Sequence, residues 1–418
     1  KSNNFLVKTK NLHNQFESFK QILIHDITPK TFADIYAQTI AYGMFAARLH
    51  DPSLENFSRQ EAAELIPKSN PFLRKLFQYV AGYDLDSRIV WIVDGLADLF
   101  RATDVAALLK NFGNATQTQD PIIHFYETFL TEYDPSNREK RGVYYTPEPV
   151  VNYIVQSVHK LLKTHFRLSD GLAAENVTLL DPAAGTLTFP AEAVKVAVKE
   201  FTDKYGLGGK AGFIKNQILE NFYAFELMMA PYAIGHLKMG FLLDELGYRL
   251  SNDERFKLYL TNTLEMEDLE QIQIPGLSSL SQESHLAGKV KKEQPLLVIV
   301  GNPPYSGISS NMNDWTEKLL KQNIDGAQSY YEVDGEPLGE KKIWLQDDYV
   351  KFLRFAQWKI QKAGFGVVGM ITNHSYLDNP TFRGMRQSLM KTFNEIYLLD
   401  LHGNSLKRES SPDGSKDE

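Results

Sequence analysis

Five consecutive residues, Gly301-Asn302-Pro303-Pro304-Tyr305, form the most specific chemical pattern in this sequence. The Asn-Pro-Pro-Tyr string should occur by chance in a chain of this length on the order of once in a thousand. The side-chain amide oxygen of Asn302 and the backbone carbonyl of Pro303 can each accept a hydrogen bond from one amine N–H. The prolines make that carbonyl rigid, because φ is fixed and no amide donor competes. The alternative interpretation is a Pro-Pro turn that only ends a buried strand.

An amine held at this turn would become a better nucleophile. The exocyclic amine of adenine is a poor one, because its lone pair is delocalised into the ring. Acceptance of both N–H bonds favours a tetrahedral nitrogen whose lone pair points at an incoming methyl group. The ring of Tyr305 offers a face on which an extruded base can stack, a contact worth about 1–3 kcal/mol. No general base is required, because the amine can lose its proton after the transfer.

Three further apolar runs end in residues that suit a nucleotide-like ligand, at the strand ends where α/β proteins bind ligands. NVTLLDP ends at Asp181, and its continuation DPAAGTLTF is small enough for backbone to approach a ligand closely. NFYAFEL ends at Glu226, whose carboxylate can accept two hydrogen bonds from a ribose diol. FKLYLTNTL ends with Asn262 and Leu264, which can contact the edge and the face of an adenine ring. DPAAGTLTF matches neither a Walker loop nor a dinucleotide fingerprint, and a structural role explains it equally well.

The elements that position these residues alternate along the chain from residue 140 onward. Apolar runs alternate with amphipathic stretches such as FPAEAVKVAVKEFTDKYG and MAPYAIGHLKMGFLLDELG, and GFGVVGMITN and EIYLLDLHG predict two more strands. This alternation predicts an α/β fold, a doubly wound and mostly parallel sheet covered by helices on both faces. Two polar stretches, roughly 266–295 and 306–343, are longer than ordinary connections, so we expect functional loops or partly disordered segments there.

Residues 1–135 have a different pattern. Apolar residues recur at helical spacing in TFADIYAQTIAYGMFAARLH, PFLRKLFQYVAG, SRIVWIVDGLADLFRAT and DPIIHFYETFLTEY, which predicts an all-α domain. No residues in these stretches have the spacing of a functional site. We therefore expect a helical domain at 1–135, an α/β domain at 136–408 and a polar tail at 409–418.

The composition of the 418 residues limits the possible partners. No apolar run approaches the ~20 residues of a membrane span, the start lacks a signal peptide, and the absence of cysteine excludes thiol chemistry. These features fit a cytoplasmic protein without a membrane partner. A net charge of −7 argues against a generally basic nucleic-acid coat, so any DNA contact requires locally concentrated positive charge.

The order DPAAGTLTF, FEL, NTL and NPPY on successive strands resembles the gamma class of S-adenosylmethionine-dependent amino-methyltransferases acting on DNA adenine. NPPYSG, ITNHSYLDNPTFRGMRQSLM and IYLLDLHGNSLK resemble, more narrowly, the methyltransferase portion of type ISP restriction–modification enzymes. The resemblance covers about residues 140–408 and implies a class I methyltransferase fold, with 1–135 as a helical coupler. It also implies that helicase and nuclease domains precede this segment in a parent polypeptide, and that a target-recognition domain follows the tail. The implied partner is double-stranded DNA with a flipped adenine.

The resemblance assigns roles to the matching residues, with no metal. The implied cofactor-binding residues are Tyr145, Thr146 and Pro147 of a closing segment, Asp181 for the methionine amino group, Pro182, Ala183 and Gly185 of the turn, Glu226 for the ribose, and Leu227, Asn262 and Leu264 around the cofactor adenine. The implied catalytic residues are Asn302, Pro303, Pro304 and Tyr305. His402 would lie under the flipped base together with Tyr305, and Arg383 and Arg386 could meet phosphates or simply form a solvated helix face.

Two departures from the family pattern leave alternatives open. Leu187 stands where the family has a second glycine, and Asn262 stands where it often has an aspartate. Leu187 favours one alternative, a non-catalytic coupler module with a degenerate cofactor fold. The other alternative is a methyltransferase acting on RNA guanine or on a protein glutamine amide, because the same acceptor motif occurs there. The intact Asn-Pro-Pro-Tyr string argues for amine chemistry.

Overall fold

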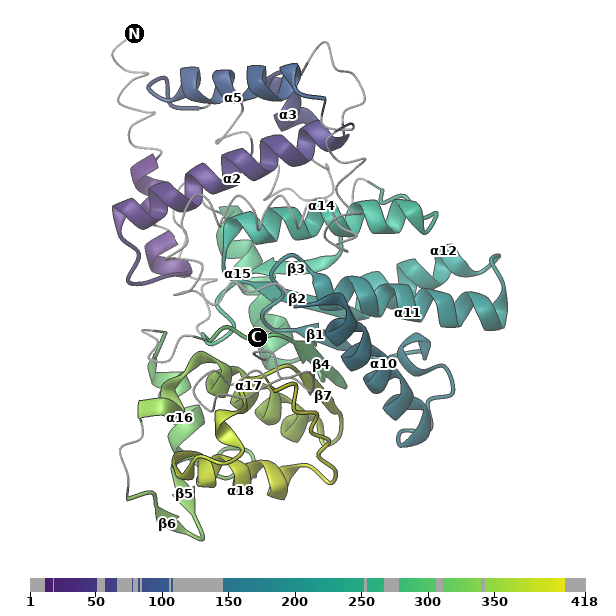
Figure 1. The fold of residues 1–418 in the computed structure, drawn as a ribbon, viewed down its shortest axis with the longest axis vertical. Coiled ribbons are helices and arrows are strands. Elements are labelled where there is room, and N and C mark those ends of the chain that lie inside the picture. Colours follow the sequence, from purple (N-terminus) through teal and green to yellow (C-terminus); the bar gives the residue numbers. More distant parts are fainter. Residues whose placement is uncertain are drawn as a thin grey trace, which may run out of the picture.

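A parallel sheet lies at the centre of the molecule (Figure 1). The computed structural model describes residues 12–17, 19–50, 57–65, 77, 82, 85–104, 107, 146–251, 254–266, 278–305, 311–339 and 343–402. The strands of the sheet are β1 (Leu179–Asp181), β2 (Phe222–Glu226), β3 (Lys257–Leu260), β4 (Val298–Gly301) and β7 (Val367–Met370). Their order is β3-β2-β1-β4-β7, and every neighbouring pair is parallel. The predicted mostly parallel α/β sheet is confirmed.

The strand order reverses between β1 and β4. From β1 the chain builds outward to β2 and β3, and then returns to the other side of β1 for β4 and β7. Ligands of open α/β sheets bind in the crevice at such a reversal, beyond the carboxyl ends of the strands. Asp181 ends β1 and Gly301 ends β4, so the predicted donor and acceptor motifs lie next to this point.

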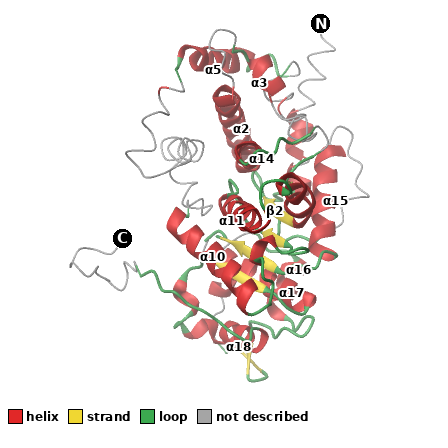
Figure 2. Ribbon diagram, turned by 90° about the vertical axis from the view of Figure 1, so that its right-hand side faces the viewer, coloured by secondary structure: helices red, strands yellow, loops and turns green. Residues whose placement is uncertain are grey.

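Helices cover both faces of the sheet (Figure 2). One face carries α10 (Glu148–Thr164), α11 (Thr188–Tyr205) and α14 (Met229–Glu245), and the other carries α15 (Ser278–Lys292) and α17 (Asp348–Ala363), beside which α18 (Arg383–Thr392) packs. Successive strand residues alternate between the two cores: Leu179 joins the first and Leu180 the second. Burial on both faces explains why these strands read as continuous apolar runs.

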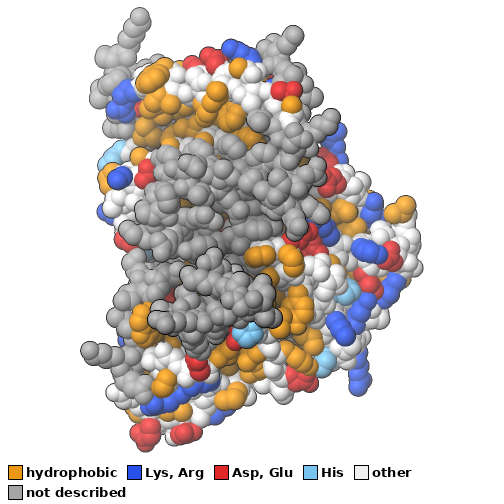
Figure 3. Space-filling view, in the orientation of Figure 1, with side chains coloured by type: hydrophobic (Ala, Val, Ile, Leu, Met, Phe, Trp, Pro, Cys, Tyr) orange, Lys and Arg blue, Asp and Glu red, His pale blue; other side chains and the backbone are white. Residues whose placement is uncertain are grey.

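The N-terminal helices pack on this sheet through α14. They include α2 (Pro29–His50), α3 (Arg59–Leu65) and α5 (Val90–Ala102), and α2 lies along α14 (Figure 1). Phe32 of α2 belongs to the same hydrophobic core as Met229 of α14. Trp91, Ile92 and Leu99 of α5 are exposed, and Figure 3 shows hydrophobic side chains gathered at this end of the molecule. The helix expected within DPIIHFYETFLTEY lies outside the described residues, and no described helix is long and apolar enough to cross a membrane.

The prediction of a loop over 266–295 is wrong for its second half, which forms α15. The buried stripe of this helix contains Leu280, Ala287 and Val290, but also Glu283 and Lys291. Both charged residues are buried with partners, so the composition looks polar although the face is internal. Residues 267–277 lie outside the described part of the chain.

Two further predictions need correction. The stretch 306–343 contains α16 (Asp314–Lys321) and a short hairpin of β5 (Glu332–Val333) and β6 (Glu336–Pro337); residues 306–310 and 340–342 are not among those described. EIYLLDLHG was expected to form a strand, yet its described residues 395–402 belong to no strand. Apolar side chains from Ile396 to Leu401 are exposed, and no described strand pairs with this segment. Its pattern alone therefore does not produce a strand.

Candidate functional site

Two carboxylates meet at the carboxyl ends of β1 and β2, where a glycine turn folds over them. Asp181 is almost completely buried, and Oδ1 accepts the Ala183 N–H at 3.1 Å. The oxygens of Glu226 accept backbone N–H groups from Gly185 at 2.8 Å and from Met228 at 2.7 Å. Gly185 has φ +52°, a left-handed conformation that glycine adopts without strain. The turn is therefore fixed by Glu226 rather than by its own sequence alone.

Burial raises the pKa of both carboxyl groups. It raises the pKa of Asp181 to about 8, a rise that the Ala183 N–H opposes and the neighbouring Glu226 charge increases. Burial also raises the pKa of Glu226 to about 7 against the effect of its backbone donors. Among the described residues, no lysine or arginine contributes to either pKa. A buried acidic pair without a protein cation is an arrangement that a cationic ligand would stabilise.

Leu187 keeps the backbone conformation that a glycine would provide. Its φ is +66° and its ψ +35°, in the left-handed region, and its N–H donates to the Ala184 carbonyl at 2.8 Å. The side chain is fully buried in the core, away from solvent. A Cβ on Gly235 would lie 3.0 Å from Leu187 Cγ, so Gly235 of α14 provides the space that this leucine fills.

The third strand end uses its polar groups internally. Asn262 Nδ2 donates to Asn311 Oδ1 at 2.9 Å, and Asn311 Nδ2 donates back to Asn262 Oδ1 at 3.2 Å. Asn262 Oδ1 also accepts the Leu264 N–H at 3.1 Å. Leu264 is fully buried in the core under α15, whereas Leu227 is partly buried. Contact of Asn262 and Leu264 with a cofactor adenine stays a prediction, and it requires Asn262 to exchange Asn311 for the ligand.

The buried residue Lys291 organises the same loop and was missed in the sequence. Its ammonium donates to Thr261 Oγ1 at 2.8 Å, to the Asn262 carbonyl at 2.6 Å and to the Glu265 carbonyl at 3.0 Å. Burial lowers its pKa to about 7. Helical spacing with Ala287 and Val290 is the signal that could have placed Lys291 on an internal face.

The same loop contacts the N-terminal helical part of the chain. Glu265 Oε1 lies 2.9 Å from His25 Nε2, and within the described part of the chain the other carboxylate oxygen is buried without a hydrogen-bond partner. Residues 240 positions apart are thereby joined directly at the edge of the candidate cofactor site. No local sequence pattern could have indicated this contact.

Asn302 lies between two hydroxyl groups. Its Nδ2 donates to Thr146 Oγ1 at 2.9 Å, and the Tyr305 hydroxyl donates to its Oδ1 at 2.7 Å. The Tyr305 hydroxyl also lies 3.1 Å from the Ile371 carbonyl, just beyond β7. The amide oxygen that should accept an amine N–H is therefore covered by Tyr305, whose ring packs 6.1 Å from that of Tyr349.

The acceptor motif adjoins the buried carboxylates directly. A Cβ on Gly301 would lie 2.7 Å from Asp181 Oδ1, so only glycine fits where β4 ends against β1. Pro303 is buried, and Pro304 is partly exposed at the same turn. The structure thus brings the predicted donor and acceptor residues together through contact between two neighbouring strand ends.

The remaining predicted residues are distributed as follows. Tyr145 lies outside the described residues, and Pro147 is the N-cap of α10. The Pro182 carbonyl accepts the Thr263 hydroxyl at 2.5 Å, which joins the first and third strand ends. His402 is exposed, and its N–H donates to Asp400.

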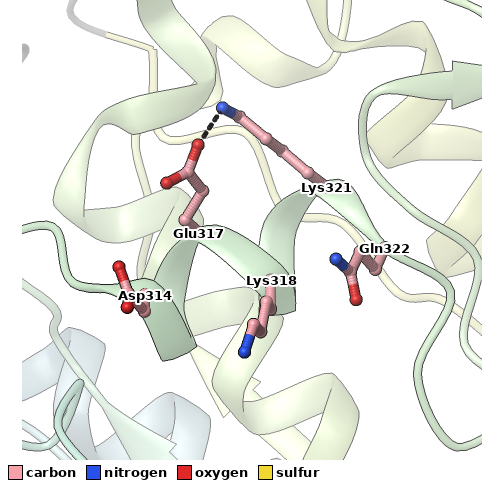
Figure 4. Close-up of a pocket in the computed structure, with 5 residues that line it drawn as sticks. All are labelled: Asp314, Glu317, Lys318, Lys321 and Gln322. Carbon is pink, nitrogen blue, oxygen red and sulfur yellow. Dashed lines mark hydrogen bonds and ion pairs between the residues drawn. The ribbon is translucent and has the colours of Figure 1, made fainter.

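Arg386 is not available as a simple phosphate contact. Its guanidinium donates to the Tyr376 carbonyl at 2.7 Å and to the Asn379 carbonyl at 2.9 Å, so it stabilises the turn before α18. A separate cavity of about 240 Å³ lies on α16, lined by Asp314, Glu317, Lys318, Lys321 and Gln322 (Figure 4). Lys321 and Glu317 form an ion pair there, and none of the predicted site residues lines this cavity.

This fold and these strand-end motifs define a methyltransferase-like α/β protein. Residues 117–330 match the N-6 DNA Methylase family, and the chain belongs to that family. The family resemblance inferred from the sequence is thereby confirmed. No curated protein sequence matches the chain.

Solved structures of larger enzymes share the fold. The DrdV–DNA complex is 21% identical, with a TM-score of 0.68 over 99% of this chain and 37% of that one. The type ISP restriction–modification enzyme LlaGI, solved as a nuclease-deletion mutant with a DNA substrate mimic, is 21% identical. Its TM-score is 0.64, and the match covers 98% of this chain and 31% of that one. The ATP-dependent type ISP enzyme LlaBIII bound to DNA is 21% identical. Its TM-score is 0.65, and the match covers 98% of this chain and 26% of that one. The chain therefore spans well under half the length of these proteins.

Proposed function

We propose that this chain transfers a methyl group from S-adenosylmethionine to the exocyclic amine of adenine in DNA, as the modification part of a restriction–modification enzyme. Membership of the N-6 DNA Methylase family supports the reaction. DrdV, LlaGI and LlaBIII were solved with DNA or a DNA mimic, which supports DNA as the partner. The observation that carries the proposal is the direct packing of Gly301, in the acceptor motif, against the buried Asp181.

The residues at the ends of β1 and β2 fit this cofactor. S-adenosylmethionine supplies a methyl group on a cationic sulfonium and carries a second positive charge on its amino group. Asp181 and Glu226 are buried acids that lack a protein cation among the described residues, so a ligand that brings an ammonium and a sulfonium group into this site would favour their ionised forms. Asp181 would hold the amino group and Glu226 the ribose hydroxyls, while Gly185 keeps the turn close. Thr146, Pro147 and Tyr145, the last of which lies outside the described residues, would close this side of the site.

The acceptor motif would hold the target amine. Asn302 Oδ1 and the Pro303 carbonyl would accept its two N–H groups and direct the nitrogen lone pair toward the methyl donor. Pro304 restrains the turn, and the Tyr305 ring would stack on an extruded base once its hydroxyl leaves Asn302. His402 would line the base from the other side. The amine loses its proton to water after transfer, so no protein base is assigned.

The remainder of the parent enzyme is part of the same proposal. Residues 1–135 would be a coupler between the methyltransferase domain at 136–408 and helicase and nuclease domains of the parent polypeptide. The tail at 409–418 would lead to a target-recognition domain. The contact between His25 and Glu265 supports a mechanical connection between coupler and cofactor site, because it joins the two parts at the loop that carries Asn262.

Substitution of Asn302 in the full-length enzyme tests the proposal. Asn302→Ala removes one preorganised hydrogen-bond partner of the amine, so methyl transfer should fall at least ~10²-fold while cofactor affinity stays nearly unchanged. Asn152→Ala is the matched control, because this asparagine on α10 is exposed and its side chain donates a hydrogen bond to Glu192, which is not a predicted site residue. Transfer of tritiated methyl groups to plasmid DNA measures the rate, and calorimetry measures cofactor binding. Near wild-type transfer by Asn302→Ala would refute the mechanism.

A further inference from the structure

We infer that the side chain of Asn311 occupies the adenine subsite of the cofactor in the ligand-free protein, and that the cofactor must displace it to bind Asn262. Asn311 is an internal competitor, which lowers the affinity of the site for every ligand that carries an adenine ring. The inference rests on the proposed function, and it adds a residue that controls how tightly the cofactor binds.

The amide of Asn262 has a single orientation. The Leu264 N–H can only donate, and it lies 3.1 Å from Asn262 Oδ1, so the oxygen is the atom that faces this backbone group. An exchange of the amide oxygen and nitrogen would place two donors against each other. The side chain therefore offers a fixed pair of groups beyond β3, the acceptor Oδ1 and the donor Nδ2.

Asn311 engages both of these groups. Asn262 Nδ2 donates to Asn311 Oδ1 at 2.9 Å, so the first amide also fixes the orientation of the second. Asn311 Nδ2 donates back to Asn262 Oδ1 at 3.2 Å. Asn262 is only 6% exposed, although it follows β3 at the edge of the sheet where ligands of this fold bind. Both polar ends of the Asn262 amide are thus occupied before any ligand arrives.

An adenine edge has the same hydrogen-bonding pattern as the Asn311 amide. Its exocyclic amine donates and a neighbouring ring nitrogen accepts, so an asparagine amide can bind this edge through two hydrogen bonds. Asn262 Oδ1 has two lone pairs, which the Leu264 N–H and Asn311 Nδ2 already use. Adenine can bind this oxygen only when one donor leaves. The Leu264 N–H belongs to the backbone of the same turn, so Asn311 is the group that is displaced.

The backbone of Asn311 stays in place when its side chain leaves. The Asn311 carbonyl accepts from Lys351 Nζ at 2.9 Å, and this fully buried ammonium also donates to Asp348 Oδ1 at 3.0 Å. Lys351 lies on α17, so a helix of the core holds the point from which the Asn311 side chain extends. A short side chain on a fixed backbone keeps a high local concentration near Asn262, which makes it an effective competitor.

Asn311→Ala in the full-length enzyme tests the inference. The variant lacks the competing amide, so S-adenosylmethionine and its demethylated product, S-adenosylhomocysteine, should each bind about three- to tenfold more tightly than they bind the wild type. Asn313→Ala is the matched control. Asn313 Nδ2 donates to the Leu264 carbonyl at 2.8 Å, in the same loop as Asn262 but away from its amide, so this variant should not gain affinity. Calorimetric titration at one pH measures all of these affinities.

A gain in affinity separates competition from a merely structural role, because a damaged loop would bind the cofactor more weakly. Asn311→Leu covers the case in which alanine disturbs the loop, since leucine has a similar volume and no hydrogen-bonding group. Tighter binding by either variant supports the inference. Unchanged or weaker binding by both variants would overturn it, and so would an equal gain in Asn313→Ala.

A double-mutant cycle identifies the partner. In the Asn262→Ala background Asn311→Ala should leave the affinity unchanged, because the amide that it covers is gone. A gain of the same size in that background would overturn the inference. The two proposals fail separately. A wild-type enzyme that neither binds S-adenosylmethionine nor methylates DNA refutes the proposed function, whereas normal methylation without a gain in Asn311→Ala and Asn311→Leu refutes only the role of Asn311.

Discussion

Cofactor affinity should depend steeply on pH, because Asp181 must be ionised to hold a cationic ligand. Burial raises the pKa of Asp181 to about 8, so the ligand-free protein is largely protonated there at neutral pH. Binding of an ammonium group then requires release of that proton. Each pH unit below the pKa weakens the apparent affinity about tenfold, which gives roughly tenfold at pH 7 and roughly 100-fold at pH 6 relative to the fully ionised site.

Affinity should therefore be greatest near pH 8. Above that pH the amino group of the ligand begins to lose its own proton, since α-amino groups titrate at about 7.7–8.0. Below pH 7 Glu226, whose pKa burial raises to about 7, adds to the loss if its ionised form is needed for the ribose. Calorimetric titration with S-adenosylmethionine at pH 6 to 9, in two buffers of different ionisation enthalpy, gives both the affinity and the number of protons released.

Asp181→Asn is the control for this measurement. The variant should bind the cofactor more weakly, and the proton released near pH 7 should disappear. Its unfolding should also change in a defined direction: a carboxyl group whose pKa is raised by folding destabilises the native state as pH rises from about 4 to about 8. The ligand-free variant should therefore melt at a higher temperature than the wild type at pH 8. Equal wild-type affinities at pH 6.5 and pH 8 would refute the role of Asp181.

Three further substitutions follow from single contacts. Tyr305→Phe removes the hydroxyl that covers the Asn302 amide oxygen, so a full-length variant should bind an extruded adenine more tightly, up to about tenfold. The fluorescence of 2-aminopurine at the target position measures how far the base is extruded. Weaker extrusion than in the wild type would contradict the prediction. Leu187→Gly relieves about 1–2 kcal/mol of left-handed strain but removes a buried side chain worth about 2–5 kcal/mol, so urea unfolding should show net destabilisation. Lys291→Met leaves three oxygens of the 261–265 loop without their donor, so both the stability of the fold and the affinity for the cofactor should decrease. An unchanged cofactor affinity would show that Lys291 does not support the cofactor site.

The sheet and the strand-end residues could be predicted because their signals are local. A strand buried on both faces must be a continuous apolar run, and parallel strands place their carboxyl ends at one edge. Asp181, Glu226 and Asn302 could therefore be assigned to a common edge from their positions after apolar runs. Their contacts agree with that assignment, through the Gly185 turn and the packing of Gly301 on Asp181.

The elements that were predicted incorrectly depend on partners far away in the sequence. Helix α15 looked like a polar loop because Glu283 and Lys291 are buried, and their partners are Arg255 and the 261–265 loop. EIYLLDLHG has the composition of a strand, but a strand requires a neighbour for its backbone groups. Thr146 and Asn302 are 156 residues apart, so their hydrogen bond could not be inferred from spacing in either segment.

The departure at Leu187 does not argue for a degenerate cofactor site. A leucine replacing a glycine could block a ligand in two ways, by changing the backbone of the turn or by filling the ligand space. The backbone is preserved, because Leu187 adopts the left-handed conformation at φ +66° and the Gly185 N–H still reaches Glu226. The side chain enters the core instead of the turn, where Gly235 on α14 leaves room for it. The leucine therefore changes core packing and adds local backbone strain. The surface of the turn that faces the crevice keeps the backbone form of a glycine turn. Within the described residues, the feature that favoured a non-catalytic module is compensated by a second glycine on a different element.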